Sequence, residues 1–205
     1  MTLIETLPTR FTDPDLTAKG EARASVHFQA LKTLWFNTGT VCNIECVNCY
    51  IESSPRNDRL VYLTLVDVSG YLDEIDEMGL GRCEIGFTGG EPFMNPDVVR
   101  MAEAALERGH EVLILTNAMR PMMRPRVQSG LRDLQARFFD RLTLRISLDH
   151  FDRDIHDTER GKGAYDATLE GMDWLSARGF KLSVAGRALW GDGDEATRLG
   201  YSNLF

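Results

Sequence analysis

Three cysteines, Cys42, Cys46 and Cys49, lie within residues 42–49 in the spacing C-x₃-C-x₂-C. Thiolates this close can reach one metal centre without a tertiary fold to bring them together, and thiolate ligands select iron–sulfur clusters, zinc or copper(I). A structural zinc or an electron-transfer cluster normally takes four protein ligands. Three neighbouring cysteines therefore predict a metal centre with one position open for chemistry.

Other uses of these thiols fit the segment less well. Packed free thiols would lie among apolar residues, whereas here they alternate with Asn43, Glu45 and Asn48. A disulfide is disfavoured because the segment holds an odd number of cysteines. Zinc needs a fourth ligand, and neither Cys83 nor a histidine stands in a partner spacing. Zinc and packed thiols remain the alternatives for the segment, and Cys83 itself is interpreted as a packed core thiol.

The composition sets limits on the class of protein. A chain of 205 residues with 43% hydrophobic residues fits one globular domain. Its 23 basic and 31 acidic residues give a net charge of −8, which disfavours nucleic acid and anionic membranes as partners. We find no signal-peptide pattern at the N-terminus and no apolar run near the ~20 residues of a membrane span. Reduced thiols then predict a cytoplasmic protein.

The elements that must position these cysteines follow from periodicity. Residues 1–31 are interpreted as an irregular N-terminal extension, with a short helix near residues 21–31. Strands are expected at residues 34–38, 83–87, 112–115, 142–148 and 180–185. Helices are expected at residues 64–78, 95–108, 126–139 and 165–177, and an amphipathic segment covers residues 195–205.

Strands that alternate with helices of this length predict a parallel sheet, open or closed into a barrel. In such folds the ligand lies beyond the carboxyl ends of the strands, on the loops that lead into the helices. The chemically unusual residues fall on those loops. The cysteines, Gly89-Gly90-Glu91-Pro92 and Thr116-Asn117 follow the first three expected strands, and Ser147-Leu148-Asp149-His150 ends the fourth.

These motifs and their order resemble the radical S-adenosylmethionine (radical SAM) superfamily over roughly residues 32–187. In that family three cysteines hold a [4Fe–4S] cluster, whose fourth iron binds the amino and carboxylate groups of S-adenosylmethionine. The resemblance implies Cys42, Cys46 and Cys49 as cluster ligands, with Tyr50 as the aromatic residue that usually follows them. The surrounding residues resemble the branch that contains the molybdenum-cofactor cyclase and peptide-modifying enzymes.

The segment Gly89-Gly90-Glu91 matches the GGEP segment of the family. Two glycines let the backbone come close to a ligand, and a carboxylate can accept from an ammonium group. Alone, the three residues would be interpreted as a strand-ending turn. The resemblance implies that they bind the amino group of the methionine moiety.

The remaining candidate residues follow the later strands. Ser147 and Asp149 resemble residues of the family near the ribose and the methionine carboxylate, although an isolated Ser-x-Asp is more often a local cap or turn. Arg160 matches a position that pairs with that carboxylate, for which bidentate geometry is suited. Thr116 and Asn117 are expected near the cofactor or the substrate. For His150 and His156 a packing or surface role is the simpler interpretation.

The resemblance implies a radical SAM enzyme. The reduced cluster would cleave S-adenosylmethionine to a 5′-deoxyadenosyl radical, which abstracts hydrogen from a small-molecule or peptide substrate that the sequence does not identify. A flavodoxin- or ferredoxin-type protein would supply the electron. The alternative function is a non-catalytic iron–sulfur protein or a partner-binding protein.

The resemblance also implies the fold, a partial (β/α)6-type barrel of which about five parallel strands are present. The family usually has six strands, and Phe205 follows the fifth. We therefore expect residues 32–205 to form a radical SAM core that is incomplete at its C-terminus.

Overall fold

The structure is a computed structural model that describes residues 13–205. Its contacts divide the chain into two compact units, residues 1–30 and 31–205. Residues 1–12 of the expected N-terminal extension lie outside the described residues.

The described part of the first unit is irregular. It holds an isolated antiparallel bridge between Leu16 and Ala22, and residues 21–31 form no helix. The prediction of a short helix there is wrong. Val26 and Phe28 have exposed side chains, so this stretch lacks the apolar packing that stabilises most short helices.

The second unit is built on one parallel sheet of five strands in the order β1-β2-β3-β4-β5, so that each strand pairs with its neighbour in sequence. The strands are β1 (Thr33–Asn37), β2 (Glu84–Thr88), β3 (Glu111–Thr116), β4 (Leu142–Ser147) and β5 (Lys181–Ala185). All five expected strands are confirmed, with ends that move by one residue in most cases.

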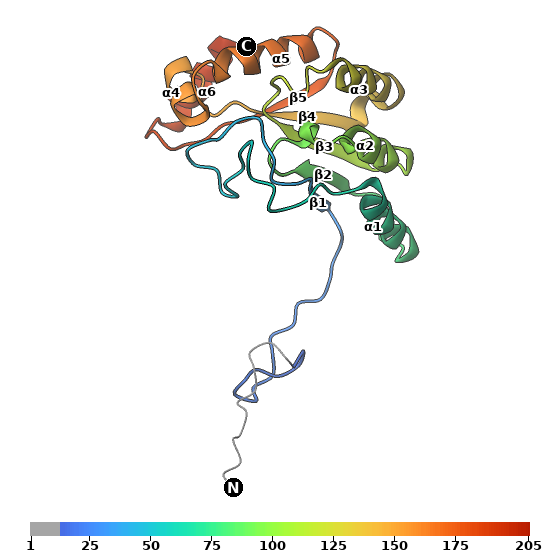
Figure 1. The fold of residues 1–205 in the computed structure, drawn as a ribbon. Coiled ribbons are helices and arrows are strands. Elements are labelled where there is room, and N and C mark those ends of the chain that lie inside the picture. Colours follow the sequence, from blue (N-terminus) through green and yellow to red (C-terminus); the bar gives the residue numbers. More distant parts are fainter. Residues whose placement is uncertain (1–12) are drawn as a thin grey trace. The chain divides into compact units, whose positions relative to one another are not determined.

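Helices connect the strands, and Figure 1 shows α1, α2 and α3 along one side of the sheet. The helices are α1 (Leu65–Glu77), α2 (Val98–Glu107), α3 (Pro125–Phe138), α4 (Arg153–Arg160), α5 (Ala164–Ser176) and α6 (Asp194–Leu204), with short 3₁₀ turns η1 (Pro92–Met94) and η2 (Phe139–Arg141). Within residues 13–205, no helix is both long and apolar enough to cross a membrane.

The core lies between the helices and one face of the sheet. On β4, Leu142, Leu144 and Ile146 are buried and alternate with half-buried polar residues, because successive side chains of a strand point to opposite faces. Right-handed connections between sequential parallel strands place the helices on the same face. The sheet is therefore the wall of a partial barrel, as predicted.

The start of α1 forms as the sequence predicts. Thr64 is the N-cap: its hydroxyl accepts a hydrogen bond from the backbone N–H of Asp67 at 3.2 Å, and the Asp67 carboxylate accepts from the Thr64 N–H at 2.9 Å. This reciprocal pair satisfies N–H groups that the first turn of a helix leaves unpaired.

The predicted start of α2 at Asn95 is wrong, since the helix begins at Val98 with Asp97 as N-cap. Asn95 is buried, and its amide donates to the main-chain oxygens of Thr38 and Leu63 at 3.0 and 2.8 Å. Its Oδ1 accepts from the Asp97 N–H at 2.9 Å, so Asn95 joins the 3₁₀ turn η1 to the start of α2 instead of capping the helix directly.

Helix α4 is not predicted by periodicity. Ile155 is its only large apolar residue, so the pattern that marks the other helices is missing. Its ends do carry a signal. The Asp152 carboxylate accepts from the backbone N–H groups of Asp154 and Ile155, and Gly161 ends the helix with a φ of 100°.

Candidate cofactor site

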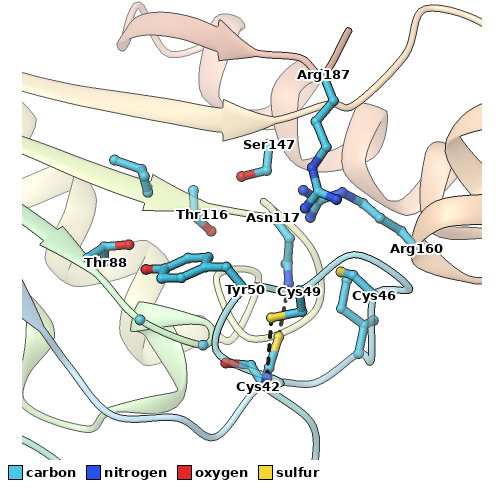
Figure 2. Close-up of a pocket in the computed structure, with 15 residues that line it drawn as sticks. Cys42, Cys46, Cys49, Tyr50, Thr88, Thr116, Asn117, Ser147, Arg160 and Arg187 are labelled. Atoms are coloured by element: carbon cyan, nitrogen blue, oxygen red, sulfur yellow. Dashed lines mark hydrogen bonds between the residues drawn. The ribbon is translucent and has the colours of Figure 1, made fainter. Parts of the chain in front are cut away.

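One pocket lies at the carboxyl edge of the sheet and collects most of the predicted site residues (Figure 2). Its lining includes Cys42, Cys46, Cys49, Tyr50, Thr88, Gly89, Gly90, Thr116, Asn117, Ser147, Arg160 and Arg187. The cysteines come from the loop between β1 and α1, and the others come largely from the ends of β2, β3 and β4. Parallel strands bring these ends to one edge.

The three thiols face this pocket from different depths. Cys42 is buried, whereas Cys46 and Cys49 are half-buried. Figure 2 shows Cys46 on the side of the pocket nearer Arg160, whose charge acts on the Cys46 thiol. Burial is the main cause that raises the pKa of Cys42 to about 12 and the pKa of Cys46 above its ordinary value. A metal centre must therefore displace protons when it binds these thiols.

The donor set at this pocket consists of three thiols, those of Cys42, Cys46 and Cys49. In the part of the chain that the structure describes, no three His, Cys, Asp or Glu side chains are already placed around one metal-ion position. An iron–sulfur cluster can take three thiolates on different iron atoms, so this donor set fits a [4Fe–4S] cluster.

Gly89 and Gly90 are required by a close approach of two backbone segments. A Cβ on Gly90 would lie 2.3 Å from the carbonyl oxygen of Val41, and one on Gly89 would lie 2.6 Å from that of Gly39. The N–H of Gly90 donates to Gly39 O at 2.8 Å, and that of Glu91 donates to Val41 O at 3.1 Å. The glycines thus hold the segment that leads into Cys42, in addition to lining the pocket.

Glu91 lies behind the pocket wall. Its side chain is buried; one carboxylate oxygen accepts from Phe93 N at 3.1 Å and Thr116 Oγ1 at 2.8 Å, and the other from Asn117 N at 2.8 Å. Burial raises the pKa of Glu91 to about 6, although these hydrogen bonds oppose the shift. The carboxylate ties the end of β2 to the end of β3, and its second oxygen has room for another donor.

Asn117 connects the end of β3 to the cysteine loop. Its amide nitrogen donates to Asn43 Oδ1 at 2.9 Å and lies 4.0 Å from the sulfur of Cys42. Its side-chain oxygen Oδ1 accepts from Met119 N at 3.0 Å. The residue is buried, so its orientation at the pocket is fixed by its neighbours.

Asp149 and Arg160 form a buried ion pair. Arg160 Nε donates to Asp149 Oδ2 at 2.6 Å and Nη2 donates to Oδ1 at 3.1 Å, while the side chains are only 2% and 8% exposed. The backbone N–H of Asp149 also donates to Nδ1 of His156 at 3.2 Å. His156 is buried, and burial is the main cause that lowers its pKa to about 4. It has the packing role expected from the sequence.

Two residues of the site are missed by the sequence interpretation. Arg187 lies just after β5 and lines the pocket; its Nε is 3.3 Å from Asp149 Oδ1, and its Nη1 donates to the Glu159 carboxylate. Its position after a strand could have identified it by the same rule that identified Thr116 and Ser147. Glu159 lies within α4 and has no comparable signal.

Comparison with known proteins identifies the family. The profile of the Radical SAM superfamily matches residues 36–194. The chain therefore belongs to the Radical SAM superfamily, as predicted.

Individual relatives cover the same part of the chain. It is 30% identical over 145 residues to the antilisterial bacteriocin subtilosin biosynthesis protein AlbA of Bacillus subtilis, a match that covers 70% of this chain and 30% of that protein. It is 31% identical over 146 residues to the mycofactocin maturase MftC of Mycolicibacterium smegmatis, with 70% and 34% coverage. The chain thus spans about a third of the length of these relatives.

The fold is similar to that of Streptococcus suis SuiB bound to S-adenosylmethionine. The TM-score is 0.67 at 17% sequence identity, over 85% of this chain and 38% of SuiB. This likeness confirms the predicted fold. The family membership confirms the predicted cofactor pair of a [4Fe–4S] cluster and S-adenosylmethionine. The role of each site residue stays a prediction.

Proposed function

We propose that Cys42, Cys46 and Cys49 bind a [4Fe–4S] cluster, that S-adenosylmethionine binds beside it, and that the chain is the radical-generating core of an enzyme. One observation carries this proposal: the three cysteines and the polar ends of β2, β3 and β4 line the same pocket. When bound, these cofactors would supply one-electron cleavage chemistry, while the cysteines and the polar strand ends would bind and orient them.

The pocket offers groups that suit the charged methionine moiety. Arg160 and Arg187 place two guanidinium groups at its lining, and guanidinium binds carboxylate by charge-assisted hydrogen bonds. Glu91 directly follows Gly89 and Gly90 of the pocket lining, and its second oxygen, which accepts from Asn117 N, can also accept from the ammonium group. Its pKa of about 6 leaves it ionised at neutral pH.

Ser147 is the residue best placed to bind the neutral part of the cofactor. It lines the pocket, and its hydroxyl has no hydrogen-bond partner among residues 13–205. A hydroxyl can donate and accept, so it can bind a ribose hydroxyl. Thr116 and Asn117 line the pocket beside it but already bond to Glu91 and to the cysteine loop.

The whole protein is proposed to act on a peptide. AlbA is a bacteriocin biosynthesis protein, and SuiB has been solved with its precursor peptide SuiA. A small-molecule substrate is the alternative. The electron is proposed to come from a flavodoxin- or ferredoxin-type protein in the cytoplasm, and the net charge of −8 disfavours nucleic acid as a partner.

The test is anaerobic reconstitution with iron and sulfide, followed by reduction and titration with S-adenosylmethionine. We expect a [4Fe–4S] electron paramagnetic resonance signal that changes on titration, and formation of 5′-deoxyadenosine. Ser147→Ala should weaken the titration by about 0.5–1.5 kcal/mol, the usual net value of one hydrogen bond.

Ser129→Ala is the matched control, because Ser129 is an exposed residue of α3 outside the pocket lining. It should titrate as the wild type does. A wild-type cluster whose signal does not respond to S-adenosylmethionine would contradict the proposal and favour a non-catalytic iron–sulfur protein.

A further inference from the structure

The turn between Cys46 and Cys49 is held by one residue of α4. The N–H of Val47 donates to the main-chain oxygen of Glu159 at 2.9 Å. The N–H of Asn48 donates to Glu159 Oε1 at 2.8 Å, and the Asn48 side-chain amide donates to Oε2 at 2.7 Å. Both residues that separate the two cysteines are therefore bonded to Glu159.

The carboxylate of Glu159 is buried and paired. Its side chain is 3% exposed, and Arg187 Nη1 donates to Oε1 and also to the Asn48 main-chain oxygen at 3.3 Å. Arg187 also forms an ion pair with Asp149, and Asp149 in turn forms an ion pair with Arg160. Two carboxylates and two guanidinium groups thus form a chain of formally zero net charge from the cysteine turn to the pocket.

Helix α4 is anchored where it carries Glu159. The Asp152 carboxylate caps its N-terminus, and the Asp157 carboxylate accepts from the N–H groups of Gly163 and Tyr165 at 2.7 and 2.8 Å. A site is held most accurately when the residues that orient its ligands are themselves fixed. The cysteine turn is therefore bonded to a rigid element rather than to a second loop.

The role of Glu159 differs from that of Glu91. Glu91 accepts only from uncharged donors at the ends of β2 and β3, whereas Glu159 accepts from the cysteine turn and from a cation. Groups that orient metal ligands and balance charge beside a cluster tune both its binding and its reduction potential.

We propose that Glu159 is a positioning residue for the cluster: it fixes the turn that presents Cys46 and Cys49, and with Arg187 it keeps the local charge neutral. The inference rests on the proposed binding of the cluster by these cysteines. Glu159 touches neither substrate nor cofactor in this proposal, so it acts through the cysteine turn.

The first test compares iron release from reconstituted protein to a chelator. Glu159→Ala removes both carboxylate contacts with Asn48 and should release iron about 10-fold faster or more, as is typical when a residue that orients a metal ligand is lost. Glu45→Ala is the control, because Glu45 is exposed, adjoins Cys46 and makes no hydrogen bond within residues 13–205. It should release iron at the wild-type rate.

The second test measures the reduction potential of the cluster. A purely structural defect would not make this potential follow the sign of the charge that each substitution removes. Glu159→Gln keeps an acceptor for Asn48 but gives the chain of two guanidinium groups and the remaining Asp149 carboxylate a net positive charge, so the potential should become more positive. Arg187→Gln should make it more negative, and the double variant Glu159→Gln/Arg187→Gln should return toward the wild type. The charge change in Glu45→Gln is screened by solvent and should shift the potential least.

Circular dichroism of each variant checks that it folds. If Glu159→Ala does not fold, the reduction potentials of Glu159→Gln and of the double variant test the inference instead. Iron-loaded Glu159 variants that match their Glu45 controls in release rate and potential would overturn this inference alone. A wild-type chain that takes up no iron would overturn the proposed function and this inference together.

Discussion

The two ends of strand β2 bury polar groups for different purposes. At the amino end, the N–H of Cys83 donates to Nδ1 of His110 at 3.2 Å, and the Cys83 sulfur lies 3.6 Å from the same nitrogen. Both side chains are buried, and Cys83 packs within the hydrophobic core. This pair connects the starts of β2 and β3 and supports the fold.

At the carboxyl end, buried polar groups instead surround a pocket. Glu91 holds Thr116 and Asn117, and Asn117 in turn reaches the loop that carries Cys42. A cysteine is thus a packed core residue at one end of the strand and a candidate metal ligand at the other. The surroundings of the thiol, rather than its burial, distinguish the two roles, since Cys42 and Cys83 are almost equally buried at 6% and 7% exposure.

The largest expected effect concerns the thiols themselves. The Cys42/Cys46/Cys49→Ala variant should bind no cluster after anaerobic reconstitution, because all three proposed ligands are gone. Cys83→Ala should bind as much iron as the wild type. Iron content and the visible absorption spectrum measure both outcomes.

Two results would contradict the assignment of different roles to Cys83 and to the three clustered cysteines. A full cluster in the triple variant would move the site elsewhere. Loss of iron in Cys83→Ala would make Cys83 a fourth ligand and favour an electron-transfer cluster.

A smaller effect is expected from the backbone of the carboxyl end. Gly90→Ala would place a Cβ 2.3 Å from the carbonyl oxygen of Val41, so the segment leading into Cys42 must shift. We expect a loss of about 1–3 kcal/mol of unfolding free energy in urea, as for other overpacked sites, together with lower iron content.

Gly70→Ala is the control for this substitution. Gly70 lies within α1, and a Cβ there would meet no atom within 4 Å. Alanine should stabilise the helix by about 0.5–1 kcal/mol and leave iron content unchanged. A Gly90→Ala variant as stable as the wild type would show that the cysteine segment is not held in this way.

The smallest effect concerns pH, and the two ends should respond in opposite directions. Burial raises the pKa of Glu91 from 4.5 to about 6, so its contribution to stability is fully present below pH 4.5 and is lost as the pH rises through about 6. The loss amounts to about 2 kcal/mol. Burial lowers the pKa of His110 below 6.5, so its contribution is present above pH 6.5 and is lost as the pH falls.

Urea unfolding of the metal-free protein across this pH range checks both signs. Glu91→Gln should remove the loss of stability between about pH 4.5 and about pH 6. His110→Asn keeps an acceptor for the Cys83 N–H and should remove a loss on the acid side. Unchanged pH profiles in both variants would show that neither group ionises differently in the folded protein.

Much of the fold follows from local patterns. The five strands and helices α1, α3 and α5 are predicted within a residue or so because their apolar residues recur with the period of a strand or a helix. Helix α4 is not predicted, because its side chains are nearly all polar and show no apolar periodicity. The start of α2 is misplaced because Asn95 ends the preceding 3₁₀ turn η1 and its amide bonds to distant main-chain oxygens.

The sequence by itself determines the candidate ligands, because Cys42, Cys46 and Cys49 are neighbours along the chain and need no fold to bring them together. It also determines that polar residues such as Asn117 and Ser147 lie at or just after the carboxyl ends of strands, and so come to one edge of a parallel sheet. These statements depend only on spacing and on the alternation of elements.

Only the tertiary structure decides how the polar side chains pair. Glu159 accepts a hydrogen bond from Asn48, which is 111 residues away in the sequence, and Arg160 donates to Asp149. Such pairs depend on the register of the sheet and on the rotation of α4 about its axis, neither of which local spacing specifies. Buried charges must find partners, and the fold alone determines which partners lie within reach.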